Sequence, residues 1–178
     1  MEPTEQNKII WTIGHSTRTI EEFISLLHSF NIALLADIRS YPGSKRYPHF
    51  NKTSLEASLR EAGIQYVHFP GLGGRRKPRP DSTNTAWRHA AFKGYADYME
   101  TDEFKQAIEE LEQVAQIQPT AYMCSEAVWW RCHRSLVSDY LKIRGWKVIH
   151  IMDVEKSQEH PYTSSAHPVQ GKLFYEKE

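Results

Sequence analysis

The chain has 178 residues, of which 40% are hydrophobic and 25% are charged, a composition typical of globular proteins. Lys and Arg together number 22, as do Asp and Glu, which excludes a protein held to nucleic acid by bulk charge but not a local basic patch. Two cysteines are too few for a disulfide scaffold, and no apolar run approaches the roughly 20 residues that span a bilayer. The polar start is not a signal peptide. We therefore expect a cytoplasmic protein without a membrane partner.

Residues 1–8 are expected to form a flexible tail, and residues 9–178 a single α/β domain. Apolar, often β-branched runs predict five buried strands and a short sixth one at an edge. The five runs cover residues 9–15, 32–38, 65–69, 120–124 and 146–152, and the edge strand covers 171–175.

The segments between these strands predict helices. Thr19 with Glu22, and Thr53 with Glu56, form two capping boxes that predict helix starts, and Gly63 is expected just after the end of the second helix. Further helices are predicted over residues 85–99, 101–116 and 131–144. Alternating helices and buried strands predict a three-layer α/β fold, with a mostly parallel sheet of about five strands and helices on both faces.

Residues whose side chains could react with or bind a ligand lie where the predicted strands end. In open α/β sheets, ligands bind beyond the carboxyl ends of the strands. The catalytic candidates there are His15, Asp37, Cys124, Glu126 and His133. The ligand-binding candidates are Gly14, Ser16, Arg39, Ser125, Arg131 and Arg134. We predict that these groups line a single concavity.

The same segments resemble the DUF488 family of small α/β proteins, which is named for having no known function. The resemblance extends over residues 9–175 and is most specific in the sequences Cys-Ser-Glu and Cys-His-Arg. The matching segments are 12–16, 37–39 with Pro42 and Ser44, 72–74, 123–126, 132–134 and 160–163, with Gly171, Leu173 and Tyr175. It implies the fold and the choice of site residues, and it brings no reaction.

A cysteine and two arginines suggest an anion site. The helix predicted to open at Arg131 offers backbone N–H groups that favour anions, and Arg131 and Arg134 add fixed charge. This environment would lower the pKa of Cys124. The C-x6-R spacing differs from the C-x5-R loop of protein tyrosine phosphatases. The alternative is that Cys124 and Cys132 are buried structural residues.

The leading hypothesis is an enzyme that acts on a small anionic ligand, either phosphate-bearing or nucleotide-like. Arg39, Arg131 and Arg134 would hold the anion, His15 or His133 would transfer protons, Glu126 or Asp37 would orient groups or act as a base, and Cys124 would be the nucleophile. The reaction class is open among hydrolysis, group transfer and glycosidic cleavage. An anion is expected to bind at the start of the helix opening at Arg131.

Two other functions remain open. The basic loop 75–93 could bind nucleic acid or nucleotides without chemistry, or could be ordinary solvated surface. Cys124 and Cys132 could serve in thiol redox chemistry or bind a metal, although no zinc-ligand spacing occurs and no metal site is predicted. We expect both thiols to be reduced, with no built-in reason to converge. No cofactor and no oligomeric state is predicted.

Overall fold

A computed structural model describes residues 8–177, so most of the expected flexible tail lies outside the described residues. The central sheet has six strands in the order β3-β2-β4-β1-β5-β6, of which the first five are parallel and β6 is antiparallel. The strands are β1 (Ile9–Gly14), β2 (Leu34–Asp37), β3 (Gln65–His68), β4 (Thr120–Cys124), β5 (Lys147–Asp153) and β6 (Lys156–Glu159). The predicted three-layer α/β fold is confirmed.

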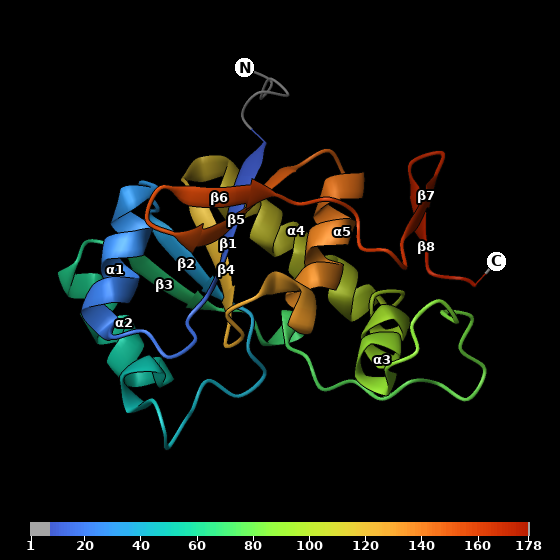
Figure 1. Cartoon of the computed structure of the whole chain (residues 1–178), viewed down its shortest axis with the longest axis horizontal. Helices are drawn as coiled ribbons and strands as arrows, with labels where there is room; N and C mark the ends of the chain where they lie inside the picture. Colours follow the sequence, from blue (N-terminus) through green and yellow to red (C-terminus); the bar gives the residue numbers. More distant parts are fainter. Residues whose placement is uncertain (1–7, 178) are drawn as a thin grey trace.

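Five helices cover the two faces of the sheet (Figure 1). They are α1 (Ile20–Ser29), α2 (Lys52–Glu61), α3 (Ala90–Tyr98), α4 (Asp102–Ile117) and α5 (Arg134–Ile143). From β1 the chain moves across the sheet to β2 and β3, then turns back to β4 and continues to β5. Because parallel crossovers are right-handed, this reversal places α1 and α2 on one face and the other three helices on the opposite face.

Each face of the sheet has its own hydrophobic core. Alternate residues of a strand point to opposite faces, and the middle strand residues divide in this way. Leu35, Ala121 and Met123 pack with Phe23, Leu26, Leu27, Leu55 and Leu59 of α1 and α2. Leu34, Ala36 and Tyr122 pack with Tyr95, Phe104, Ile108, Leu111, Leu136 and Val137 of α3 to α5. Buried strands therefore read as continuous apolar runs in the sequence.

Helix ends follow some of the predicted signals and not others. The Thr19 hydroxyl accepts a hydrogen bond from the Glu22 N–H at 3.1 Å and caps α1, and Gly63 with φ +78° follows the end of α2. The capping box at Thr53 is wrong, because α2 begins at Lys52 with Asn51 as its N-cap.

Two other predicted helices begin later than expected. The helix expected over 85–99 begins only at Ala90. The helix expected from 131 begins at Arg134, after a short 3-10 turn, Trp129–Arg131.

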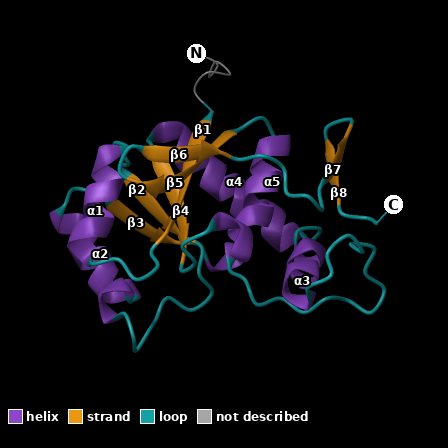
Figure 2. Ribbon diagram, in the orientation of Figure 1, coloured by secondary structure: helices purple, strands orange, loops and turns teal. Residues whose placement is uncertain are grey.

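The C-terminal segment differs from the prediction. The strand expected over 171–175 is β8 (Lys172–Phe174), which pairs with β7 (His167–Val169) in a separate hairpin instead of joining the central sheet (Figure 2). One edge of the central sheet, beside β5, is β6, a polar strand that follows β5 through a tight turn. Among residues 8–177, no helix has the length and apolar character needed to cross a membrane.

The topology leaves an opening at the carboxyl end of β4. After β1 and β2 the chain leaves toward the α1 and α2 face, whereas after β4, which lies between them, it leaves toward α5. Neighbouring strands whose connections diverge in this way create a crevice at their carboxyl ends, where ligands bind in open α/β sheets.

Candidate functional site

A cavity of about 730 Å³ lies at the carboxyl ends of β1, β2 and β4. Of the residues proposed from the sequence, eight line it: His15, Ser16, Arg39, Cys124, Ser125, Glu126, Arg131 and His133. Gly14, Asp37 and Arg134 are not in its lining and lie buried behind it. The lining also contains residues that were not predicted for the anion site: Cys132, Thr17, Ser40, Tyr41, Gly43, Ser44, Arg46, Tyr47, Gly74, Arg75 and Ala127.

The missed lining residues come mostly from the loop 40–47 after β2 and from the loop that follows β3. The signals in the sequence were the position of these loops after predicted strands, the family resemblance at Ser44 and at 72–74, and the basic character of the loop that begins at Arg75. The cationic lining residues are Arg39, Arg46, Arg75 and Arg131, and the single acidic one is Glu126. This excess of positive charge is suited to an anionic ligand.

Two cysteines meet at the wall of this cavity. The Sγ atoms of Cys124, the last residue of β4, and Cys132, just before α5, lie 2.7 Å apart, and both cysteines are free. The expectation that they had no reason to converge is therefore wrong. The turn Trp129–Arg131 brings the chain back to the end of β4, so residues eight positions apart come into contact.

Arg134 places a buried positive charge behind the two thiols. Its side chain is only 1% exposed, and Nη2 donates to the backbone carbonyls of Glu126 and Ala127 at 3.3 and 3.4 Å. Among the described residues, Nε and Nη1 have no hydrogen-bond partner. A buried guanidinium without a carboxylate favours a negative charge nearby, and the thiols are the adjacent groups that can supply one.

The environment separates the two thiols electrostatically. Burial alone would raise the pKa of Cys124, but the hydrogen bond from Cys132 and the charge of Arg134 outweigh it and lower the pKa to about 7. Burial, and then the neighbouring Cys124, raise the pKa of Cys132 well above its ordinary value. When the pair loses a proton near neutral pH, the negative charge is therefore centred on Cys124 and is stabilised by the Cys132 S–H group.

Arg39 is held rigidly by Asp37. Its Nε and Nη2 donate to the two carboxylate oxygens of Asp37 at 2.9 and 2.7 Å, and Nη2 also donates to the Phe50 carbonyl. The Tyr66 hydroxyl donates to the same carboxylate. Burial and the adjacent Asp37 raise the pKa of Tyr66. Asp37 therefore orients Arg39, and this bidentate contact leaves Nη1 of Arg39 free to face His15 and the cavity.

His15 is a neutral group at pH 7. Burial lowers its pKa to about 4, and the charge of Arg39 acts in the same direction. Its Nδ1 lies 2.9 Å from the Ser16 carbonyl, which only accepts, so Nδ1 carries the proton. Nε2 is then the acceptor that faces Nη1 of Arg39 at 3.5 Å. The ring stacks on Phe50 with centroids 4.3 Å apart, so its position is fixed.

His133 has similar properties on the other side of the cavity. Burial, followed by the charges of Arg134 and Arg76, lowers its pKa to about 4. Its Nε2 donates to the Ile38 carbonyl at 2.8 Å, which ties the start of α5 to the end of β2. The ring packs against Gly74, where a Cβ atom would come within 3.0 Å of Nδ1.

Backbone hydrogen bonds join the loops after β1 and β4. The N–H of His15 donates to the Cys124 carbonyl, and the N–H of Ser16, whose φ is +50°, donates to the Ser125 carbonyl. The two loops therefore continue the sheet beyond its last strand residues. This continuation places His15 beside Cys124 in the lining of the cavity.

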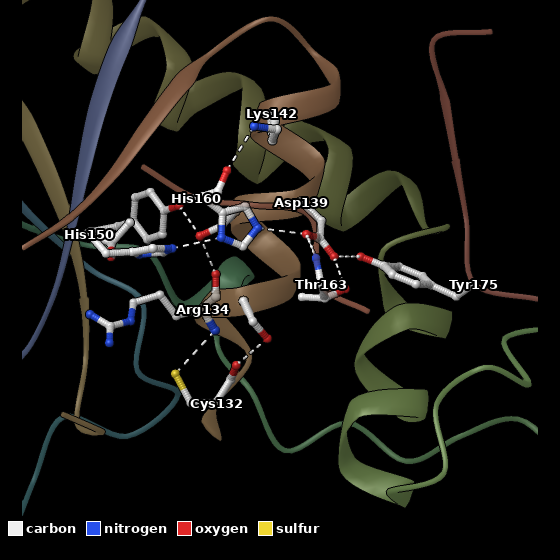
Figure 3. Close-up of polar contacts among 12 residues, drawn as sticks. Cys132, Arg134, Asp139, Lys142, His150, His160, Thr163 and Tyr175 are labelled. Carbon is white, nitrogen blue, oxygen red and sulfur yellow. Dashed lines mark hydrogen bonds and ion pairs between the residues drawn. The ribbon is translucent and has the colours of Figure 1, made fainter. Parts of the chain in front are cut away.

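A buried polar chain anchors α5 from behind (Figure 3). Asp139 of α5 accepts hydrogen bonds from His160 Nε2, from the Thr163 hydroxyl and N–H, and from the Tyr175 hydroxyl. His160 in turn contacts His150 of β5 at 2.8 Å. These contacts fix the helix whose start carries Cys132 and Arg134.

Three arginines of the basic loop 75–93 have separate contacts. Arg75 lines the cavity rim and lies over the ring of exposed Tyr41, and Arg76 lies over the Tyr98 ring at 3.7 Å. Arg79 pairs with Glu100 at 2.9 Å. The charges of these three arginines are therefore divided between the cavity and contacts with neighbouring side chains.

Within residues 8–177, no group of three or more His, Cys, Asp or Glu side chains is arranged to hold a metal ion.

The anion site was expected at the start of a helix opening at Arg131, but the helix does not begin at that residue. Arg131 lies in the turn before the helix, and α5 begins three residues later with His133 as its N-cap.

Comparison with known proteins identifies a family without a reaction. Residues 19–141 match the family described as "Domain of unknown function DUF488". No curated protein and no solved structure shows a significant match to the chain.

Proposed function

The chain belongs to the DUF488 family, which brings no reaction, and from the geometry of the cavity we propose that it is an enzyme acting on a small anionic, phosphate-bearing or nucleotide-like ligand, with Cys124 as nucleophile. The observation that carries this proposal is the placement of a low-pKa thiol in the wall of a cationic cavity. A thiolate is the nucleophilic form of cysteine. Arginines around it would hold the ligand's anionic group beside the sulfur.

The roles of the two histidines follow from their surroundings. With pKa values of about 4, His15 and His133 are neutral at pH 7 and lack the second, acidic proton that a general acid donates to a leaving group. The proton on Nδ1 of His15 and that on Nε2 of His133 are each held by a backbone carbonyl. We assign both residues to positioning: His15 supports Arg39, and His133 holds the start of α5.

Arg39, Arg131 and Glu126 have complementary parts in this proposal. Arg39 is preoriented by Asp37, and the exposed Arg131 stands at the cavity wall near the thiols. Glu126 is exposed and follows Cys124 by two residues in the sequence. Its carboxylate lines the cavity and can exchange protons with a bound ligand. Arg134 acts from behind, by stabilising the thiolate.

The charge of an alkylating reagent tests this proposal without knowledge of the substrate. Iodoacetate carries the negative charge expected of the ligand, and iodoacetamide is its neutral analogue. We expect Cys124 to react with iodoacetate faster, relative to iodoacetamide, than a neutral small thiol does, by roughly tenfold at low salt. Inorganic phosphate should slow the iodoacetate reaction.

Two exposed arginines provide the matched comparison. Arg131→Ala should reduce the preference for iodoacetate, whereas Arg60→Ala on the outer surface of α2 should leave it unchanged. A Cys124 that reacts only after unfolding, or that shows no charge preference and no protection by phosphate, would remove it from the proposed mechanism.

A further inference from the structure

We propose that Cys124 and Cys132 form a two-electron dithiol–disulfide couple that a small hydroperoxide oxidises through attack by Cys124. This inference goes beyond the proposed reaction and does not depend on the identity of the anionic ligand. It rests on the position of the two sulfur atoms, on the groups around them and on their access to the cavity.

The geometry is already close to that of a bonded pair. The Sγ–Sγ distance is 2.7 Å, compared with about 2.05 Å in a disulfide. Closing this gap requires a movement of less than an ångström. Cys132 lies outside regular structure, between the turn Trp129–Arg131 and α5, so the adjustment can be made there without bending the central strand β4.

The surroundings give the two sulfurs different tasks. Cys124 carries the shared negative charge, supported by Arg134, and so is the attacking atom. Cys132 keeps its proton and accepts a hydrogen bond from the Arg134 backbone N–H at 3.3 Å. It is therefore held beside Cys124 as the thiol that closes the disulfide. A low-pKa cysteine next to a second thiol is the arrangement of redox-reactive pairs.

The oxidant is expected to be small. Cys124 is only 1% exposed, although it lines the cavity. A peptide disulfide such as oxidised glutathione is too bulky to bring its sulfur into line with a sulfur so enclosed, since thiol–disulfide exchange depends on access. Hydrogen peroxide is close to water in size and can enter the cavity.

The chemistry balances in two steps. The Cys124 thiolate attacks one peroxide oxygen, the O–O bond breaks, and the leaving oxygen takes the proton that Cys124 lost on ionisation, which gives a sulfenic acid and water. Cys132 then attacks the Cys124 sulfur, the S–O bond breaks, and hydroxide leaves with the Cys132 proton as a second water. Two thiols thus lose two electrons and two hydrogens to one peroxide.

Intact mass provides the test, because the chain has only these two cysteines. With one equivalent of hydrogen peroxide, the full-length protein should lose the mass of two hydrogens and both free thiols together, remain monomer-sized on a non-reducing gel, and recover with dithiothreitol. Cys132→Ser should instead gain one oxygen at Cys124, trapped by dimedone. Cys124→Ser should react with hydrogen peroxide at least about tenfold more slowly than the wild type.

The intact mass and free-thiol count of the wild-type protein test the proposal even if a variant fails to fold. Gain of oxygen with one thiol left, or retention of both thiols at a peroxide concentration that oxidises the unfolded chain, would overturn the proposal. Disulfides found only between chains would do the same. The alkylation experiment on reduced protein is separate, so the failure of either proposal can be recognised independently of the other.

Discussion

A Cβ atom at Gly14 would lie 1.7 Å from the carbonyl oxygen of Glu126. The end of β1 is thus in direct backbone contact with the loop that follows β4, and only glycine allows it. We expect Gly14→Ala to push this loop away from the sheet and to lower the free energy of unfolding by about 1–3 kcal/mol. Urea unfolding measures the loss, and the alkylation rate of Cys124 should change with it.

Gly43→Ala is the matched control for that substitution. Gly43 lines the cavity near the same loops, but a Cβ there would meet no atom within 4 Å. Its stability should stay within about 0.5 kcal/mol of the wild type. Equal effects of the two substitutions would mean that the contact between Gly14 and Glu126 does not fix the loop.

The buried ion pair between Asp37 and Arg39 should be far more important than an exposed one. Asp37→Asn leaves the guanidinium of Arg39, which is 8% exposed, without its counter-charge, a change that costs about 3–5 kcal/mol. Glu56→Gln breaks the surface pair with Arg60 and should cost less than about 1 kcal/mol. Chemical denaturation of both variants measures the difference, and similar losses would contradict this interpretation.

His15 should make the protein sensitive to acid. The folded chain keeps His15 neutral down to a pKa of about 4, whereas in the unfolded chain it binds a proton near its ordinary pKa of 6.5. The unfolded state therefore gains protons first, and stability is lost as pH falls from 6.5 to about 4. The contribution of His15 is on the order of 3 kcal/mol.

His15→Gln should reduce the loss of stability between pH 7 and pH 4 by that amount. His133 and His150, whose pKa values are also lowered by burial, still contribute in this variant, so the comparison isolates His15. His28→Gln, at an exposed histidine of α1, controls for the loss of a histidine side chain as such. An unchanged pH profile in His15→Gln would show that this side chain is protonated in the folded protein without penalty.

Arg134 should control the acidity of Cys124. Arg134→Met keeps most of the buried volume and removes the charge, so the pKa of Cys124 should rise from about 7 toward the ordinary value of 9.0. The midpoint of the alkylation rate against pH measures this shift. Arg60→Met, on the exposed side of α2, should leave the midpoint in place. An unshifted midpoint in Arg134→Met would mean that the hydrogen bond from Cys132, and not the charge of Arg134, lowers the pKa of Cys124.

The sequence predicted the central strands well because their residues are buried on both faces. It missed β6, whose four residues Lys156–Glu159 are all exposed and polar, so no apolar pattern marks them. The capping box at Thr53 failed because the 3-10 turn Pro48–Phe50 leads directly into α2, and the side chain of Asn51 accepts from the Ser44 N–H instead of capping the helix.

The positions of the candidate site residues followed from the strand-end rule, but their mutual contacts did not. Asp37 and Arg39 could be paired from their spacing, because residues two apart on a strand share a face. The contact between Cys124 and Cys132 depends on the turn that precedes α5, and the sequence placed the start of that helix three residues too early. The acidity of the thiol depends in turn on this contact.

The strand order shows which parts of the central sheet lie outside the segment that matches the family. The family match covers residues 19–141, whereas β1, which lies between β4 and β5, ends at residue 14. A fragment cut at the limits of the match would lose β1, β5 and the three tail residues that bind Asp139. Its remaining sheet would end at β4, with an open hydrogen-bonding edge and an uncovered apolar face, which favours aggregation. The segment that matches the family is therefore shorter than the segment that completes the sheet.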